Sequence, residues 1–204
     1  RVPITVEELQ LKETTGTHQR VIDMVAHELI TRERIEEWKE LPDVAKGVDV
    51  SRDIVKLAAI ERHKNTGHVG LGFLGKYGLK KGAVATSIGH DSHNLVIAGV
   101  TDEDMVLAGN RVIENGGGLA IALDGKVLAD LPLPIGGLMA DEPVEVVDEK
   151  LEHMKKLSME LGISEDIDAF MTLAFISLPV IPKLRLNTYG VVDVEKHQVV
   201  EARF

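Results

Sequence analysis

Cysteine is absent from this sequence of 204 residues. Without thiols the chain cannot form disulfides, cannot use a thiolate nucleophile and cannot bind zinc through sulfur, including zinc centres of the His/Cys/Cys type. The absence of cysteine is compatible with a cytoplasmic protein, and we predict a cytoplasmic location.

Aromatic residues and positive charge are also scarce. Phe, Trp and Tyr make up 3% of the sequence, and the formal net charge is -10. A surface that follows phosphates needs an excess of basic residues, and single-stranded nucleic acid is commonly held by stacking on aromatic rings. We therefore predict that nucleic acid is not a partner.

Long hydrophobic runs are missing as well. No apolar run approaches the roughly 20 residues that a membrane helix needs, and the first residues lack the hydrophobic region of a signal peptide. We therefore predict no membrane partner. The residues that are present, 44% hydrophobic and 27% charged, are typical of a globular protein that can bury a sizeable core.

The length of the chain suits one domain with an appendage. Pro42 and the polar stretch that runs to Gly47 indicate a boundary, because both interrupt regular structure. We divide the chain into an N-terminal extension, residues 1–46, and a main domain, residues 47–204. No internal repeat is visible, so a solenoid is disfavoured.

The extension has a β-rich pattern. Apolar and polar residues alternate over residues 20–30, as they do in extended strands. Over residues 32–41 a helix is the competing interpretation, because Ile35, Trp38 and Leu41 share one face at helical spacing.

The main domain mixes helical and strand patterns. The continuously apolar residues 170–181 fit a helix or a strand. The sequence predicts an α/β or α+β fold, a mixed β-sheet with helices packed on it, preceded by the short β-rich extension. The other expected elements are a helix over 51–63 with Ser51 as its N-cap, strands over 68–74, 83–88 and 95–98, a helix from Thr101 to Gly116, a hairpin over 119–131 that turns at Asp124-Gly125, a helix over 141–161 and two short strands around 193–198.

Glycines alternate with apolar residues in the predicted strand over 68–74. Gly70 and Gly72 lie on the face opposite Val69, Leu71 and Phe73. A phosphate-binding loop is the other interpretation, but a following helix start and the lysine of a P-loop are both missing. We therefore expect the glycine face to be crowded by neighbouring backbone or a ligand.

A dense polar cluster separates the predicted strands over 83–88 and 95–98. Both strands have the length and bounding glycines of buried strands, so their connection must lie at an end or edge of the sheet, where side chains can meet a ligand. Asp, Ser and Asn can also satisfy only their own turn. Two imidazoles beside a carboxylate are more than a turn needs and favour a functional site. The cluster consists of His90, Asp91, Ser92, His93 and Asn94.

An ordered set of short motifs carries a family resemblance. The sequence resembles the C-terminal region of bacterial and archaeal adenine deaminases of the amidohydrolase superfamily, and the match extends over nearly the whole chain. The motifs are Gly70-Leu-Gly-Phe73, Gly78-Leu-Lys-Lys-Gly82, His90-Asp-Ser-His-Asn94, Asp102-Glu-Asp-Met105, Gly116-Gly-Gly118, Leu131-Pro-Leu-Pro-Ile135 and Phe170-Met-Thr-Leu173.

The resemblance implies a role in hydrolysing adenine to hypoxanthine and ammonia. It also implies manganese or iron held by an N-terminal barrel. We find no His-x-His strand motif that would indicate this barrel in the present sequence. We therefore expect a piece of the enzyme that closes or supports the active site, has adenine and the barrel as partners, belongs to a homo-oligomer and supplies no metal ligand. The residues that we assign are His90, Asp91 and His93 as catalytic groups, and Ser92, Asn94 and His68 as substrate-binding groups.

Two other functions remain open at this stage. The chain could be a non-catalytic structural or oligomerisation domain, in which the polar cluster is a self-satisfied turn. It could also be a small metal-binding module, because His90 and His93 form a His-x-x-His pair with Asp91 between them.

Overall fold

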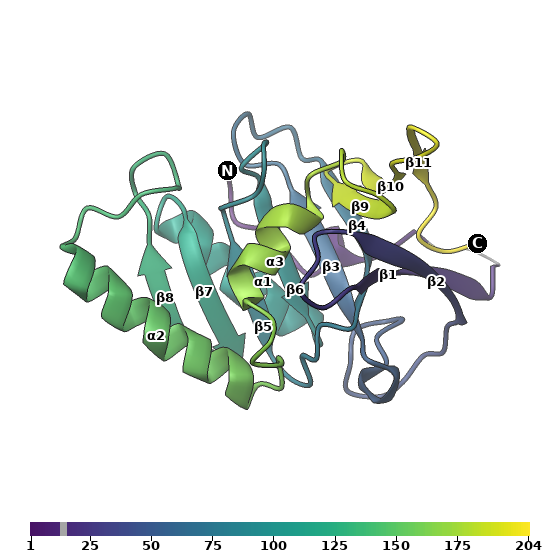
Figure 1. The fold of residues 1–204 in the computed structure, drawn as a ribbon, viewed down its shortest axis with the longest axis horizontal. Helices are drawn as coiled ribbons and strands as arrows, with labels where there is room; N and C mark the ends of the chain where they lie inside the picture. The colour runs from purple at the N-terminus through teal and green to yellow at the C-terminus, as the bar shows by residue number, and fades with distance from the viewer. Residues whose placement is uncertain (13–15) are drawn as a thin grey trace.

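A computed structural model describes residues 1–12 and 16–204, and in these residues one mixed sheet of eight strands organises the chain (Figure 1). Only β1 and β4 are paired in parallel, and the other neighbours within this described sheet are antiparallel. In spatial order the strands are β2 (Thr31–Glu37), β1 (His18–Met24), β4 (Val69–Gly75), β3 (Ile54–Ile60), β6 (Leu95–Gly99), β5 (Ala83–Thr86), β7 (Gly118–Leu123) and β8 (Lys126–Pro132).

Helices cover both faces of this sheet. Helix α1 (Asp102–Glu114) packs on one face, while α2 (Val144–Glu160) and α3 (Ala169–Ile176) lie on the other (Figure 1). The second face also carries a small sheet of β9 (Leu184–Asn187), β10 (Gly190–Asp193) and β11 (Gln198–Val200). Two short 3-10 turns, η1 (Glu7–Leu9) and η2 (Val50–Arg52), complete the described elements. The predicted mixed sheet with packed helices is confirmed as an α+β fold.

The hydrophobic core is divided by the large sheet. On the α1 side, Ile60 and Ile97 pack with Met105, whereas on the opposite side Val96 packs with Leu173. Side chains alternate between the faces of a strand, so a central strand covered on both faces buries nearly all of its side chains. Strand β3 is accordingly buried at every position.

This burial explains why the helix predicted over residues 51–63 is wrong. Residues 54–60 form β3, in which Lys56 alone is polar, and a run that is apolar at nearly every position has no periodicity that separates helix from strand. Ser51 lies within η2, which is capped by the Asp49 side chain and ends at Asp53 in a left-handed conformation. The alternative helix over residues 32–41 is also wrong, because residues 31–37 form β2 and pair with β1.

Other sequence signals are confirmed. The Thr101 side chain caps α1, the Asp124-Gly125 turn joins β7 to β8, and residues 144–160 of the predicted long helix form α2. The ambiguous run over 170–181 contains α3 up to Ile176. Strand β9 was not predicted.

The glycine face of β4 is crowded, as the sequence indicated. A Cβ atom on Gly70 would lie 1.9 Å from the carbonyl oxygen of Asn187, so the small sheet can approach β4 only where a side chain is missing. Tight packing against neighbouring backbone therefore accounts for Gly70.

The extension joins the edge of the large sheet. Strand β1 pairs with β2 on one side, and on its other side Val21–Asp23 pair with β4. The N–H of His18 and the N–H of Arg20 are bonded to the carbonyls of Phe204 and Ala202. The C-terminus thus completes the side of β1 that β4 leaves open, while the domain boundary at residue 46 stays a prediction.

The turn of the β7–β8 hairpin provides a direct stability test. Asp124 and Gly125 both have positive φ, 51° and 73°, which suits a primed turn. A Cβ at Gly125 would meet nothing within 4 Å, so Gly125→Val isolates the backbone cost. We expect a loss of about 1 kcal/mol or more in unfolding free energy from a urea titration. An unchanged midpoint would contradict this account of the turn.

Candidate functional site

The polar cluster lies at one end of the large sheet. Residues 87–94, here called the histidine loop, connect β5 to β6. Ile60 pairs with both Leu95 and Val69, so the end of β3 and the start of β4 meet at the same end of the sheet. The predicted loop position is therefore confirmed.

Helix α3 holds the first part of the histidine loop. The N–H of His90 donates to the carbonyl of Ala174 at 2.9 Å, and the Ser177 hydroxyl donates to the His90 carbonyl at 3.4 Å. The His90 ring also lies on Phe175, with 4.7 Å between ring centroids. These contacts leave the imidazole partly exposed, while the Asp91 carboxylate, 3.9 Å from it, is 90% exposed. Both groups can therefore reach a ligand or an approaching protein surface.

Two residues at the end of β3 hold the second part of the loop. Arg62 donates from Nε to the His93 carbonyl at 2.6 Å, and His63 Nε2 lies 2.7 Å from the Ser92 carbonyl. Because a carbonyl only accepts, this contact requires a proton on His63 Nε2. Arg62 also donates to the carbonyl of Gly136 at 2.8 Å. One guanidinium therefore joins the histidine loop to the loop that follows β8.

The electrostatics of this end of the sheet are set by local hydrogen bonds. Burial raises the pKa of the Glu61 carboxyl, but the backbone N–H groups of Thr66, Lys64 and His63 outweigh this effect and lower the pKa to about 2. Burial lowers the pKa of Arg62. The ionised Glu61 thus closes the turn after β3 by accepting from the backbone of His63, Lys64 and Thr66.

Two adjacent residues of the histidine loop carry unpaired polar atoms. Within the described part of the chain, His93 Nδ1 and Asn94 Oδ1 are buried without a hydrogen-bond partner. Buried polar groups in folded proteins are nearly always bonded, so a pair of unpaired atoms in neighbouring residues marks a place where another molecule or domain can supply partners.

The structure brings together five of the six predicted site residues. His90, Asp91, Ser92, His93 and Asn94 share the histidine loop. His68 lies at the same end of the sheet, but its ring packs on Tyr189 with 4.9 Å between centroids. Sequence analysis missed Arg62, His63 and Phe175. Recognising β3 as a strand would have placed Arg62 and His63 at this end.

The described residues do not form a metal centre of their own. Among residues 1–12 and 16–204, no group of three or more His, Asp or Glu side chains is placed to hold a metal ion. The His90 and His93 rings are 6.4 Å apart between centroids. The donor set available here therefore does not fit a manganese or iron site.

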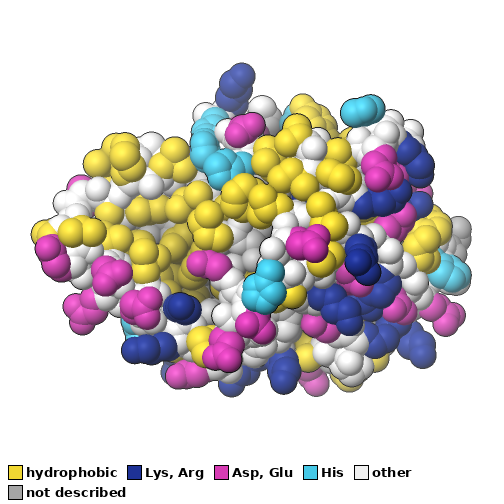
Figure 2. All heavy atoms as spheres, in the orientation of Figure 1, with side chains coloured by type: hydrophobic (Ala, Val, Ile, Leu, Met, Phe, Trp, Pro, Cys, Tyr) yellow, Lys and Arg dark blue, Asp and Glu magenta, His cyan; other side chains and the backbone are white. Residues whose placement is uncertain are grey.

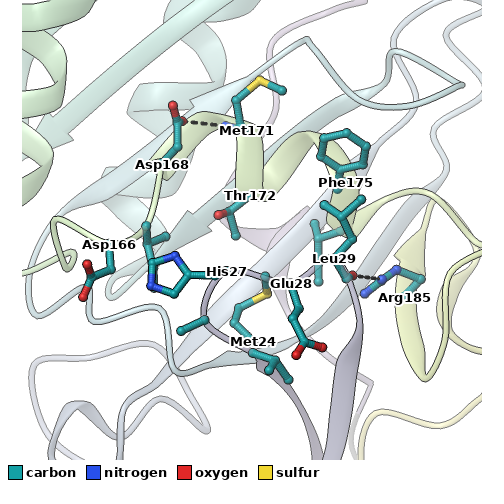
Figure 3. A pocket seen from close by; sticks show the side chains of 14 residues that line it. Met24, His27, Glu28, Leu29, Asp166, Asp168, Met171, Thr172, Phe175 and Arg185 are labelled. Atoms are coloured by element: carbon teal, nitrogen blue, oxygen red, sulfur yellow. Dashed lines mark hydrogen bonds between the residues drawn. The ribbon is translucent and has the colours of Figure 1, made fainter.

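A pocket of about 230 Å³ lies beside α3 (Figure 3). It is bounded by α3 and by the connection between β1 and β2, with Leu29, Met171 and Phe175 among its apolar walls. Phe175 is shared between this pocket and the contact with His90. The pocket and the histidine loop are therefore linked through one helix.

No helix in the described ranges is long and apolar enough to cross a membrane.

The eight-stranded mixed sheet with helices on both faces defines an α+β domain, and the histidine loop lies at one end of that sheet. The family model of the adenine deaminase C-terminal domain matches residues 28–198, and the chain belongs to this family. The family resemblance of the sequence is thereby confirmed.

Individual relatives support the same assignment. Adenine deaminase 2 of Carboxydothermus hydrogenoformans is 47% identical over 185 residues, covering 89% of this chain and 32% of the relative. The adenine deaminase of Oleidesulfovibrio alaskensis is 50% identical over 181 residues, covering 89% and 31%. That of Archaeoglobus fulgidus is 47% identical over 198 residues, covering 97% and 34%. The chain spans about a third of the length of these relatives.

Proposed function

We propose that this domain acts within an enzyme that hydrolyses adenine to hypoxanthine and ammonia. Membership of the adenine deaminase C-terminal domain family supports the proposal, as do relatives named adenine deaminase. In this reaction the oxygen of water bonds to the purine carbon that bears the exocyclic amine. The bond from that carbon to the amine nitrogen then breaks, and ammonia leaves with the transferred protons.

We assign the histidine loop to the adenine side of this chemistry. The observation that carries the assignment is the pair of unpaired buried atoms, His93 Nδ1 and Asn94 Oδ1. An amide oxygen can accept from an exocyclic amine, and an imidazole N–H can donate to a purine ring nitrogen. Imidazole can also transfer protons near neutral pH, which suits His90 and His93 to catalytic roles. Asp91 completes the catalytic set, while Ser92, Asn94 and His68 are the substrate-binding candidates.

The metal is assigned elsewhere in the intact protein. Because the described residues hold no fitting donor set, we propose that manganese or iron is bound by an N-terminal amidohydrolase barrel outside these 204 residues. The absence of cysteine supports a cytoplasmic enzyme of purine metabolism, and the resemblance to the adenine deaminase family supports a homo-oligomer.

Ammonia release tests the proposed function. Residues 1–204 alone, supplied with adenine and with manganese or iron, are expected to release no ammonia above the uncatalysed rate. The intact protein that contains this domain is expected to release one ammonia for each hypoxanthine formed. Turnover by residues 1–204 alone would show a complete active site here, and an intact, metal-loaded protein inactive on adenine would refute the proposed activity.

A further inference from the structure

One face of the domain carries an extended apolar surface. Figure 2 shows apolar side chains gathered between α2 and α3, over α3 and over the segment after α3, with the surface hollowed between the two helices and charged side chains along the outer side of α2. We call this surface the apolar face. Val144 of α2 is 73% exposed, Met171 of α3 is 45% exposed and Val180 after α3 is 67% exposed. Contiguous apolar surface of this kind usually marks a docking site.

Helix α2 is poorly covered for an amphipathic helix. Of its 17 residues only Met154 and Ser158 are buried, and both lie in its second half. In the first half, Val144 and Leu151, which lie on the same side of the helix as Met154 and Ser158, remain exposed. A surface helix normally buries its apolar stripe. Among the described residues, the apolar stripe in the first half of α2 is left uncovered.

The pocket beside α3 adds a specific chemical preference. Its walls are largely apolar, whereas Glu28 and Asp166 place carboxylates around it, and the Asp168 carboxylate also lines it while capping α3 (Figure 3). The Arg185 guanidinium is already bonded to the carbonyls of Leu184, Leu29 and Pro182. A lysine or arginine side chain fits such a pocket, because its stem packs on apolar walls while its charged end meets carboxylates.

The apolar face is connected to the histidine loop. Helix α3 contributes Met171 to the face, and its Ala174 carbonyl accepts the N–H of His90. Arg1 and Arg62 line one small cavity of about 70 Å³ together with Val112 and Ile113 of α1, so residue 1 lies at this end of the sheet, on the α1 side. The chain matches about a third of the length of its relatives and belongs to a family of C-terminal domains, so about two thirds of each relative lies outside the matched region. A preceding part would therefore enter beside the histidine loop.

We propose that the apolar face docks the part of an adenine deaminase that precedes this domain, with a basic side chain of that part inserted in the α3 pocket. This inference rests on the proposed function only for the position of the domain within such an enzyme. Docking on α3 places the histidine loop at the edge of the interface. Partners for His93 Nδ1 and Asn94 Oδ1 would then come from the interface or from substrate bound beside it.

Hydrogen exchange in the intact protein tests the proposed interface. Amides of α3 and of the first half of α2 are expected to exchange about tenfold or more slowly in the intact protein than in residues 1–204 alone. Met171→Asp and, independently, Val144→Asp should remove this protection, because each places a carboxylate in an apolar contact. Ile35→Asp on β2 is the matched control, since Ile35 is 52% exposed and lies away from the face. Equal exchange in both proteins, or equal effects of the control, would overturn the proposal.

A charge reversal tests the pocket separately. Asp166→Lys should lower the protection of α3 in the intact protein about tenfold, whereas Glu165→Lys, an exposed neighbour that does not line the pocket, should leave it unchanged. Equal effects of the two variants would reject the basic side chain. Protection that appears in residues 1–204 alone as concentration rises would assign the face to a second copy and overturn the proposal.

Ammonia release from adenine is measured on the same samples, so that the two hypotheses fail differently. Protected helices in a metal-loaded protein inactive on adenine would refute the proposed activity and retain the interface. An active enzyme with unprotected helices would refute the interface and retain the activity.

Discussion

Replacement of His90 or His93 by Asn is expected to lower adenine turnover by the intact protein about 100-fold while leaving the fold in place. Loss of one positioned group that transfers a proton or donates a hydrogen bond typically has an effect of this size. Asn retains local hydrogen bonding, and at His93, where φ is 48°, it tolerates the left-handed conformation. Turnover number, KM and thermal midpoint should be measured on the same variants.

His197→Asn supplies a matched control. His197 has φ of 52° and is exposed in the turn between β10 and β11, far along the chain from the histidine loop. This variant should keep full turnover. Full turnover in both loop variants would refute the assignment of the histidine loop to the active site. A drop in thermal midpoint that accounts for the lost activity would return the loop to a structural role.

Asp102→Ala is expected to destabilise the domain by about 3–5 kcal/mol, because it leaves a buried ammonium without its counter-charge. Lys56 is fully buried in β3 and donates to Asp102 Oδ1 at 2.6 Å and to the Leu9 carbonyl at 2.8 Å. Burial lowers the pKa of Lys56, and the Asp102 charge opposes that shift. Urea unfolding at pH 7 measures the loss of free energy.

The controls separate charge burial from helix capping. Glu103→Ala removes an exposed acid from the same first turn of α1 and should cost less than about 1 kcal/mol. In Asp102→Ala the folded-state pKa of Lys56 falls further below its unfolded value. Between those two values the unfolded chain binds more protons, so the stability of the variant should rise with pH. The double replacement Lys56→Met with Asp102→Leu should recover most of the loss. A full deficit in the double variant would contradict this account.

Local signals in the sequence were sufficient for several elements. Thr101 ahead of three acids predicted the start of α1, and Asp124-Gly125 predicted the hairpin turn, because each depends on backbone chemistry within a few residues. The helix expected over 51–63 failed for a physical reason. Ile54–Ile60 is buried on both faces by elements distant in sequence, so its apolar residues do not alternate with polar ones as they do in a half-exposed strand.

The candidate site divides in the same way. The histidine loop could be recognised because its polar residues are contiguous and lie between two apolar strands. The role of Arg62 could not be predicted, because its partners His93 and Gly136 lie 31 and 74 residues away. Only the order of strands in the sheet brings these residues together.

The pairing of His18 with Phe204 has a consequence for biosynthesis. Residues 202–204 emerge from the ribosome after the rest of this sequence, yet they complete the hydrogen bonding of β1 near its start. Until they emerge, the N–H groups of His18 and Arg20 remain an open strand edge that another nascent chain can pair with. Closure of this edge must therefore wait until residues 202–204 have emerged, and the open edge is a risk for aggregation until then.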